Sequence, residues 1–153
     1  MRPHFLFAAG LCAAALVAAP IPKDKEKVKD EAAILGSWSI DKFDAGGEKP
    51  PPGAQVAAIR FVFADKGVFK MTGGPVERGE GTFKLDPAAK VKTIDISLDG
   101  KQMLGLYELD GDTLKLCIPD RPDSPRPDEI KADGKARISV VTFKRVKDEK
   151  KDK

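Results

Sequence analysis

Apolar and polar side chains alternate in a series of short segments that runs through most of this chain. A period of two places the apolar side chains on one face of a β-strand and the polar ones on the other, as in an antiparallel sheet with one buried face. The pattern predicts about eight strands. Their apolar residues fall into these groups: Trp38 and Ile40; Ile59, Phe61 and Phe63; Phe69 and Met71; Phe83 and Leu85; Ile94, Ile96 and Leu98; the run Leu104–Leu109; Leu114, Leu116 and Ile118; Val141 and Phe143.

Turn signals separate neighbouring segments. Short turns are expected at Asp65-Lys66-Gly67, Asp99-Gly100-Lys101 and Asp110-Gly111-Asp112, and Asp-Gly between apolar runs is a strong hairpin signal. Two longer loops, Lys49–Gly53 and Pro119–Pro127, are rich in proline. Because proline lacks an amide donor and fixes its own φ, both loops are expected to interrupt the sheet.

Sequential strands joined by short turns leave two unpaired sheet edges unless the first strand pairs with the last. We therefore predict an all-β domain over residues 33–146, folded as an eight-stranded antiparallel up-and-down barrel. A short helix is expected before the first strand, within residues 25–35. A two-sheet sandwich is the alternative architecture.

The N-terminal segment has the features of a secretory signal peptide. Met-Arg-Pro-His precedes an apolar run from Phe5 to Ala19, and small residues at Ala18 and Ala19 provide a cleavage site. The apolar run is about 15 residues, shorter than the roughly 20 that span a bilayer as a helix. We therefore predict a signal peptide over residues 1–19 and export to the periplasm or the extracellular space, with a retained membrane anchor as the alternative. Leu11 before Cys12 argues against lipid attachment, which needs a small residue there.

Charged segments flank the predicted domain. Residues 20–32 are expected to form a linker that runs into the helix, and residues 147–153 a disordered tail. The chain has 27 basic and 24 acidic residues and a net charge of +3. Because the two signs are interleaved, nucleic-acid binding is not expected. The protein is expected to be a monomer.

Removal of the signal peptide would also remove His4, the only histidine. Serine–histidine and cysteine–histidine catalysis and an ordinary zinc site then become impossible. We therefore expect no catalytic residue, no metal and no cofactor. The remaining thiol, Cys117, is expected to be reduced and buried beneath the proline-rich loop that follows it.

Several motifs resemble a known family. Leu35-Gly36-Ser37-Trp38 resembles the Gly-x-Trp start of lipocalin-like barrels. Leu85-Asp86-Pro87, Ile94-Asp95-Ile96, the block from Gly105-Leu106-Tyr107 through Gly111-Asp112-Thr113-Leu114 to Cys117, and Arg126-Pro127 are similar to exported proteins that are expanded in planctomycete bacteria and described as lipocalin-like. Val91 departs from that family, which more often has proline there. The resemblance spans residues 33–146 and implies a fold and a location but no reaction.

Trp38 and Arg145 are expected to meet at one end of the barrel. If the first and last strands pair antiparallel, the start of one lies beside the end of the other, and the guanidinium can lie over the indole ring. The alternative is that Arg145 is the first solvated residue of the tail.

Other polar residues have a structural and a functional interpretation. Asp110 and Asp112 fit a turn better than a calcium loop, and Asp86 with Asp95 is not expected to be a catalytic pair. Arg121 and Arg126 can either bind an anion or tie the proline-rich loop to backbone carbonyls, and the structural role is favoured. Tyr107 is expected in the core with its hydroxyl at a barrel end.

The expected function is binding without catalysis, with a small apolar molecule held inside the barrel. An anionic group of that molecule is expected near Arg145. The alternative is a structural or protein-interaction module of the cell envelope with no small ligand. A cavity of roughly 300 Å³ or more favours the carrier or sensor, and a solidly filled barrel favours the module. The inward residues expected to contact the ligand are Phe61, Phe63, Phe69, Met71, Phe83, Ile94 and Leu116.

Overall fold

The computed structural model describes residues 23–47, 58–73 and 79–147 of the 153-residue chain. The predicted signal peptide, the proline-rich segment Lys49–Gly53 and residues 148–153 of the charged tail lie outside these ranges.

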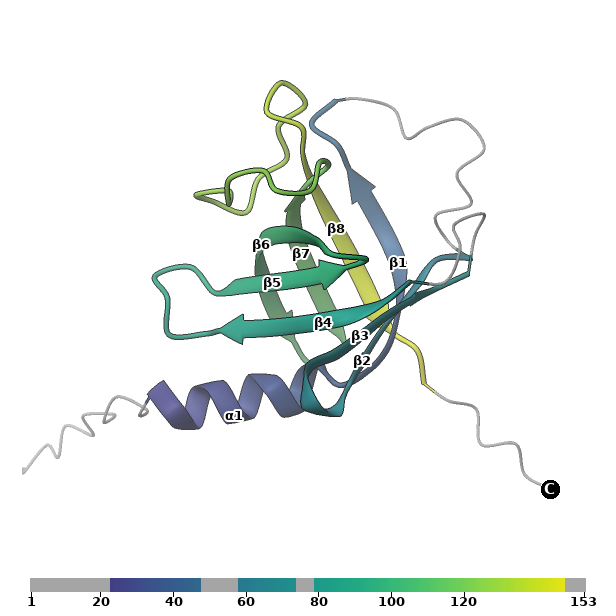
Figure 1. Ribbon diagram of the computed structural model, residues 1–153, viewed down its shortest axis with the longest axis vertical. Coiled ribbons are helices and arrows are strands. Elements are labelled where there is room, and N and C mark those ends of the chain that lie inside the picture. Colours follow the sequence, from purple (N-terminus) through teal and green to yellow (C-terminus); the bar gives the residue numbers. More distant parts are fainter. Residues whose placement is uncertain (1–22, 48–57, 74–78, 148–153) are drawn as a thin grey trace, which may run out of the picture.

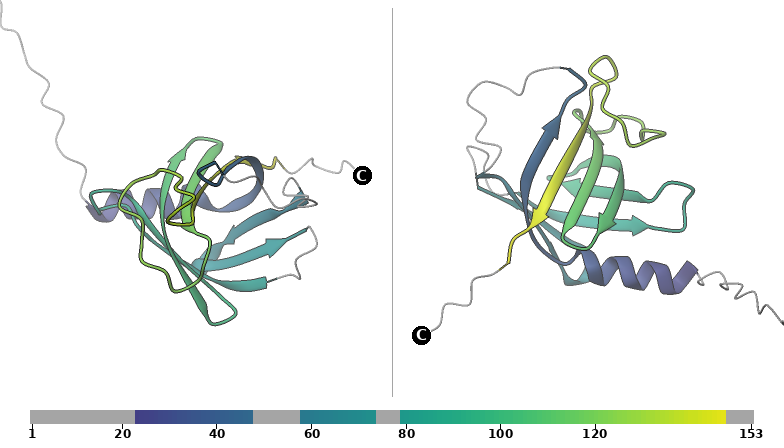
Figure 2. Two further views of the ribbon diagram at one scale, coloured as in Figure 1. Left: turned by 90° about the horizontal axis from the view of Figure 1, so that it is seen from above. Right: turned by 180° about the vertical axis from the view of Figure 1, so that it is seen from behind.

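The predicted all-β, eight-stranded up-and-down barrel is confirmed. Each strand pairs antiparallel with the next, and the last pairs with the first, as Figure 1 and the rear view in Figure 2 show. Pairing of the first and last strands removes the exposed edges that an open sheet would leave. The strands are β1 (Gly36–Asp44), β2 (Arg60–Ala64), β3 (Val68–Thr72), β4 (Gly79–Asp86), β5 (Thr93–Leu98), β6 (Lys101–Asp110), β7 (Thr113–Pro119) and β8 (Ile138–Arg145).

The three predicted short turns join the strands where the sequence places them. The β2–β3 turn is a single 3-10 turn, η2 (Asp65–Gly67), with Lys66 and Gly67 at φ values of 62° and 72°. Asp99 and Gly100 in the β5–β6 turn have φ values of 52° and 75°. Gly67, Gly100 and Asp99 suit these positions because Gly and Asp tolerate the left-handed backbone region.

Helix α1 (Lys23–Ile34) lies across one end of the barrel (Figure 1). The helix begins at Lys23 and so covers most of residues 20–32, the charged stretch predicted to be a linker running into a short helix. Lys, Glu and Ala, which favour helix, supply most of its residues. We call this the closed end; there β1 and β3 begin and β8 ends. At the opposite, open end, β1 and β3 end and the β5–β6 turn lies.

A β-bulge in β1 keeps large side chains pointing into the barrel. The register with β8 shifts between Ile40 and Lys42, so that Ile40 lies opposite Phe143 and Phe43 lies opposite Val141. One extra residue on the bulged strand reverses the alternation that follows. Trp38, Ile40 and Phe43 therefore all contribute to the core.

Inward side chains fill the barrel at the closed end. Trp38, Phe69, Tyr107 and Phe143 are completely buried, and Phe63 is 1% exposed. Five phenylalanines, which come from β2, β3, β4 and β8, pack ring against ring, with centroid separations between 4.7 and 5.4 Å. This aromatic cluster, Phe61, Phe63, Phe69, Phe83 and Phe143, packs the barrel from the open end toward the closed end.

Candidate functional site

An apolar pocket of about 370 Å³ opens at the open end of the barrel. We call it the mouth pocket. Strands β2, β3, β5, β6 and β7 supply most of its wall, and the loop after β7 supplies Pro122. Its lining residues are Phe61, Phe69, Met71, Leu98, Asp99, Lys101, Met103, Ile118 and Pro122.

The floor of the mouth pocket is aromatic. Phe61 is 8% exposed and Phe69 is completely buried. Their ring centroids are 5.1 Å apart and their planes are nearly perpendicular, at 86°. Phe61 also packs on Phe143, with 4.7 Å between centroids. Rings held by several neighbours in this way form a rigid floor.

The walls are aliphatic and contain two thioethers. Met71, Leu98, Met103 and Ile118 are partly buried and pack against the core. Gly79 on β4 leaves room for one of them, because a Cβ atom there would come within 2.6 Å of Leu98 Cδ1. Thioether side chains are flexible and polarizable, so this wall can adapt to a bound molecule.

The rim carries one charge of each sign. Asp99 and Lys101 flank Gly100 in the β5–β6 turn and are both exposed. Beside them, the Asp123 amide donates to the Gln102 carbonyl over 2.8 Å. This contact holds the start of the long β7–β8 loop, and with it Pro122, against the mouth.

The structure brings three of the seven predicted ligand-contacting residues to the mouth pocket, namely Phe61, Phe69 and Met71. Phe63, Ile94 and Leu116 lie in the packed core. Phe83 is also in the core and lines a separate groove at the closed end.

The pocket also contains four residues that were not predicted as ligand contacts, namely Leu98, Met103, Ile118 and Pro122. The side chains of the first three alternate onto the inner face of their strands, as do those of the seven predicted ligand-contacting residues. Their position at strand ends that meet at one barrel opening is the signal that could have identified them.

The groove that Phe83 lines is larger, about 530 Å³, but less suited to an apolar ligand. It lies between the end of α1, the β2–β3 turn and β4. Glu31, Asp65, Lys66 and Lys84 place four charged side chains around it. The mouth pocket is therefore the better candidate, because its charged residues are confined to the rim.

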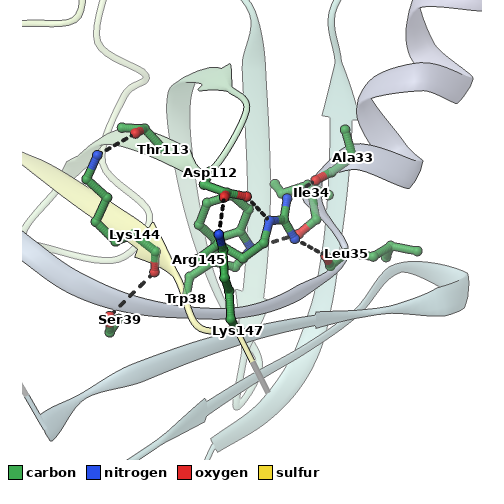
Figure 3. Close-up of polar contacts among 10 residues, drawn as sticks. All are labelled: Ala33, Ile34, Leu35, Trp38, Ser39, Asp112, Thr113, Lys144, Arg145 and Lys147. Carbon is green, nitrogen blue, oxygen red and sulfur yellow. Dashed lines mark hydrogen bonds and ion pairs between the residues drawn. The ribbon is translucent and has the colours of Figure 1, made fainter. Parts of the chain in front are cut away.

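Arg145 joins β8 to the end of α1 at the closed end (Figure 3). Its guanidinium carbon lies 4.2 Å from the centre of the Trp38 ring, which agrees with the predicted pairing. Its Nη1 and Nη2 atoms donate to the carbonyls of Leu35 and Ala33, each over 2.6 Å. Its Nε donates to Asp112 Oδ1 over 3.0 Å, and Trp38 Nε1 donates to the Ile34 carbonyl over 2.8 Å.

These contacts correct the expectation that Arg145 receives an anionic group of the ligand. The guanidinium is occupied by helix carbonyls, which lack donors at a helix end, and by Asp112. It also lies at the opposite end of the barrel from the mouth pocket. The fluorescence of Trp38 therefore reports on the closed end and not on the pocket.

A buried carboxylate also fixes α1 to the barrel. Asp30 is 7% exposed. It accepts hydrogen bonds from the Tyr107 hydroxyl over 2.7 Å and from Lys92 Nζ over 2.8 Å. Tyr107 is thus in the core with its hydroxyl at a barrel end, as predicted, and its partner comes from the helix.

Arg126 ties the long loop to the outer wall. Its Nη1 donates to the Gly105 carbonyl over 2.7 Å, and its Nη2 to Asp95 Oδ1 over 2.5 Å. The favoured structural role of Arg126 is therefore confirmed. Asp95 is its partner on the outside of the barrel.

Cys117 is completely buried beneath that loop, as predicted. Its Sγ lies 3.5 Å from the Glu129 carbonyl and 3.8 Å from that of Lys131. Burial raises the pKa of the Cys117 thiol, more than the contact with the Lys131 backbone lowers it. The thiol is therefore protonated and poorly reactive at neutral pH.

The described ranges contain no group of three or more His, Cys, Asp and Glu side chains that could hold a metal ion. The helical structure in those ranges offers no segment of the length and apolarity needed to cross a membrane. The chain has no match among protein-family models, curated proteins or solved structures. Any functional conclusion must therefore come from the geometry of the site.

Proposed function

We propose that this is an exported, non-enzymatic binding protein that carries or senses a small, largely apolar molecule in the mouth pocket. The pocket itself is the observation that carries the proposal. Its volume of about 370 Å³ exceeds the roughly 300 Å³ at which ligand sites begin.

The chemistry of the lining supports selection by shape and apolarity. Phe61, Met71 and Leu98 offer hydrocarbon surface, and burying apolar area there contributes about 25 cal/mol per Å². The opposite charges of Asp99 and Lys101 at the rim can orient one polar group. The resemblance to exported lipocalin-like proteins agrees with the proposal.

The alternative, a structural or interaction module of the cell envelope, is favoured by the filled closed-end half of the barrel. Trp38, Phe63 and Leu114 leave little free volume there, since each is at most 1% exposed. Because the closed end is filled, the two functions differ only at the mouth pocket, where the carrier or sensor binds a small molecule and the module does not.

Methionine-methyl NMR tests the proposal directly. The chain has three methionines, of which Met71 and Met103 both line the pocket and Met1 lies in the predicted signal peptide. Titration of the protein, labelled with ¹³C at the methionine methyl groups, with a panel of small apolar molecules should shift both signals. If no member of the panel shifts either signal, the binding function is wrong.

Export is tested separately. The mature N-terminus is expected between Ala18 and Lys23, in a periplasmic or secreted fraction. N-terminal sequencing that finds Met1 on a cytoplasmic protein would contradict export without affecting the binding site.

A further inference from the structure

We infer that the mouth pocket, if it binds a ligand as proposed above, selects compact molecules built on a single aromatic ring and excludes long acyl chains. Three features of the pocket lead to this class: its depth, the arrangement of its floor, and the sulfur atoms in its wall.

The pocket is shallow. Met71 near the rim and Phe69 at the floor are two residues apart on β3, which is about 7 Å along a strand. Phe63 lies opposite Phe69 in the β2–β3 register, and Phe63, Ile96 and Leu116 in the core next to the floor are each at most 1% exposed. A long acyl chain would need a path along the barrel axis, and these side chains occupy it.

The volume agrees with this depth. Ligand pockets usually measure about 300–1,000 Å³, and the mouth pocket, at about 370 Å³, is near the lower limit. One ring with a small substituent suits such a space, whereas a fused ring system or a long chain would extend into solvent.

The floor favours an aromatic ring over a saturated one. Phe61 is the ring of the floor with exposed surface, and a ligand ring can make an offset or an edge contact with it, while the completely buried Phe69 supports it with its plane at 86°. Both are preferred arrangements of aromatic pairs. Met71 and Met103 add thioether sulfurs, which pack favourably against ring edges.

The rim suits one small polar substituent. Asp99 can accept a hydrogen bond and Lys101 can donate one, so a hydroxyl or an amine on the ring can find a partner at the opening. The ligand class is therefore a monocyclic aromatic molecule with one such group.

Four probes test the class by calorimetry and by the methionine-methyl signals: p-cresol, its saturated analogue methylcyclohexanol, naphthol and palmitate. We expect p-cresol to bind about fivefold or more tightly than methylcyclohexanol, because only p-cresol gains the aromatic and sulfur contacts. It should also give ring-current shifts at Met71 and Met103. Palmitate should leave both signals unchanged.

A pair of matched variants tests the size limit. Leu98→Ala enlarges the pocket, and we expect the affinity for naphthol relative to p-cresol to rise about tenfold. Leu109→Ala is the control, because Leu109 is also a partly buried leucine packed on the core but lies toward the end of β6 remote from the mouth. A gain of selectivity for the larger ring cannot result from misfolding.

The outcomes separate this inference from the proposed function. If palmitate or methylcyclohexanol binds as tightly as p-cresol, or if Leu98→Ala leaves the preference unchanged, the aromatic class is wrong and the binding function stands. If none of these probes, and no member of the wider apolar panel, moves the methionine signals, both are wrong.

Discussion

Arg145 illustrates how much of a single residue's role the sequence predicts. Arg145 lies on the same side of β8 as Val141 and Phe143, and this position, together with barrel closure, predicts the contact with Trp38. It does not predict the hydrogen bonds to Ala33 and Leu35, because these depend on where α1 ends relative to the strand. The side chain therefore connects the last strand, the first strand and the helix.

We expect Arg145→Ala to lower the free energy of unfolding by about 2–4 kcal/mol, more than the roughly 1 kcal/mol that the cation–π contact alone suggests. The larger value reflects the loss of charge-assisted hydrogen bonds. Their contribution to stability is reduced because the Arg145 side chain is 24% exposed. Arg145→Lys should fall between, because lysine keeps the charge but not the planar fork.

Urea denaturation measures this difference. Lys144→Ala is the control, since Lys144 is exposed and its Nζ donates to Thr113 Oγ1; its effect should stay within about 0.5 kcal/mol. Equal effects of Arg145→Ala and Lys144→Ala would show that the contacts at the closed end contribute nothing to stability.

Cys117 gives a pH prediction. Because its pKa is raised in the folded protein, the native thiol should react with an alkylating reagent only at a pH above the roughly 8.5 at which a free cysteine ionises. The raised pKa also contributes to stability. This contribution is fully present below the pKa that the Cys117 thiol has in the unfolded chain, and it is lost as the pH rises through the pKa of the thiol in the folded protein. Alkylation rates from neutral to alkaline pH, with and without urea, measure the effect. Equal rates in native and unfolded protein would contradict burial.

Two elements outside the barrel wall differ in how far the sequence predicts them. The position of the short helix is predicted, but its docking through Asp30 is not, because a carboxylate in a run of alternating charges looks solvated. The Asp30 contacts with Tyr107 and Lys92 become visible only when the helix crosses the closed end. Covering of the outer wall by the β7–β8 loop is predicted from the proline content and from Cys117.

Arg126→Ala should loosen that loop. The lost charge-assisted hydrogen bonds contribute about 1.5–3 kcal/mol, so the open loop should become roughly ten- to a hundredfold more populated. Alkylation of Cys117 under native conditions, at constant pH, should accelerate by the same factor.

Arg121→Ala is the matched control, because Arg121 is an exposed arginine of the same loop. It should leave the alkylation rate of Cys117 within about twofold of the wild type. If the two arginine variants behave alike, Arg126 does not hold the loop in place.

At the scale of the whole molecule, alternation and turn chemistry predict the barrel because every strand obeys the same period and the connections are short. Alternation does not predict how deeply each inward side chain packs. Phe61 and Phe63 both point inward from β2, yet Phe61 lies at the mouth pocket and Phe63 in the core toward the closed end. That difference depends on which strand ends meet at each opening, and this follows from the register of the strand pairs.

The last prediction concerns the stability of the whole barrel with its pocket occupied. A ligand that binds only the folded state stabilises it by about 2.7 kcal/mol when present at about 100 times its Kd. Any probe that shifts the Met71 and Met103 signals should therefore raise the Tm by roughly 5–15 °C, as measured by differential scanning calorimetry. Met103→Trp should remove most of this increase because the indole fills the pocket, even if overpacking lowers the starting Tm. A probe that shifts the Tm of Met103→Trp as much as that of the wild type must bind elsewhere, and the mouth pocket would then not be its site.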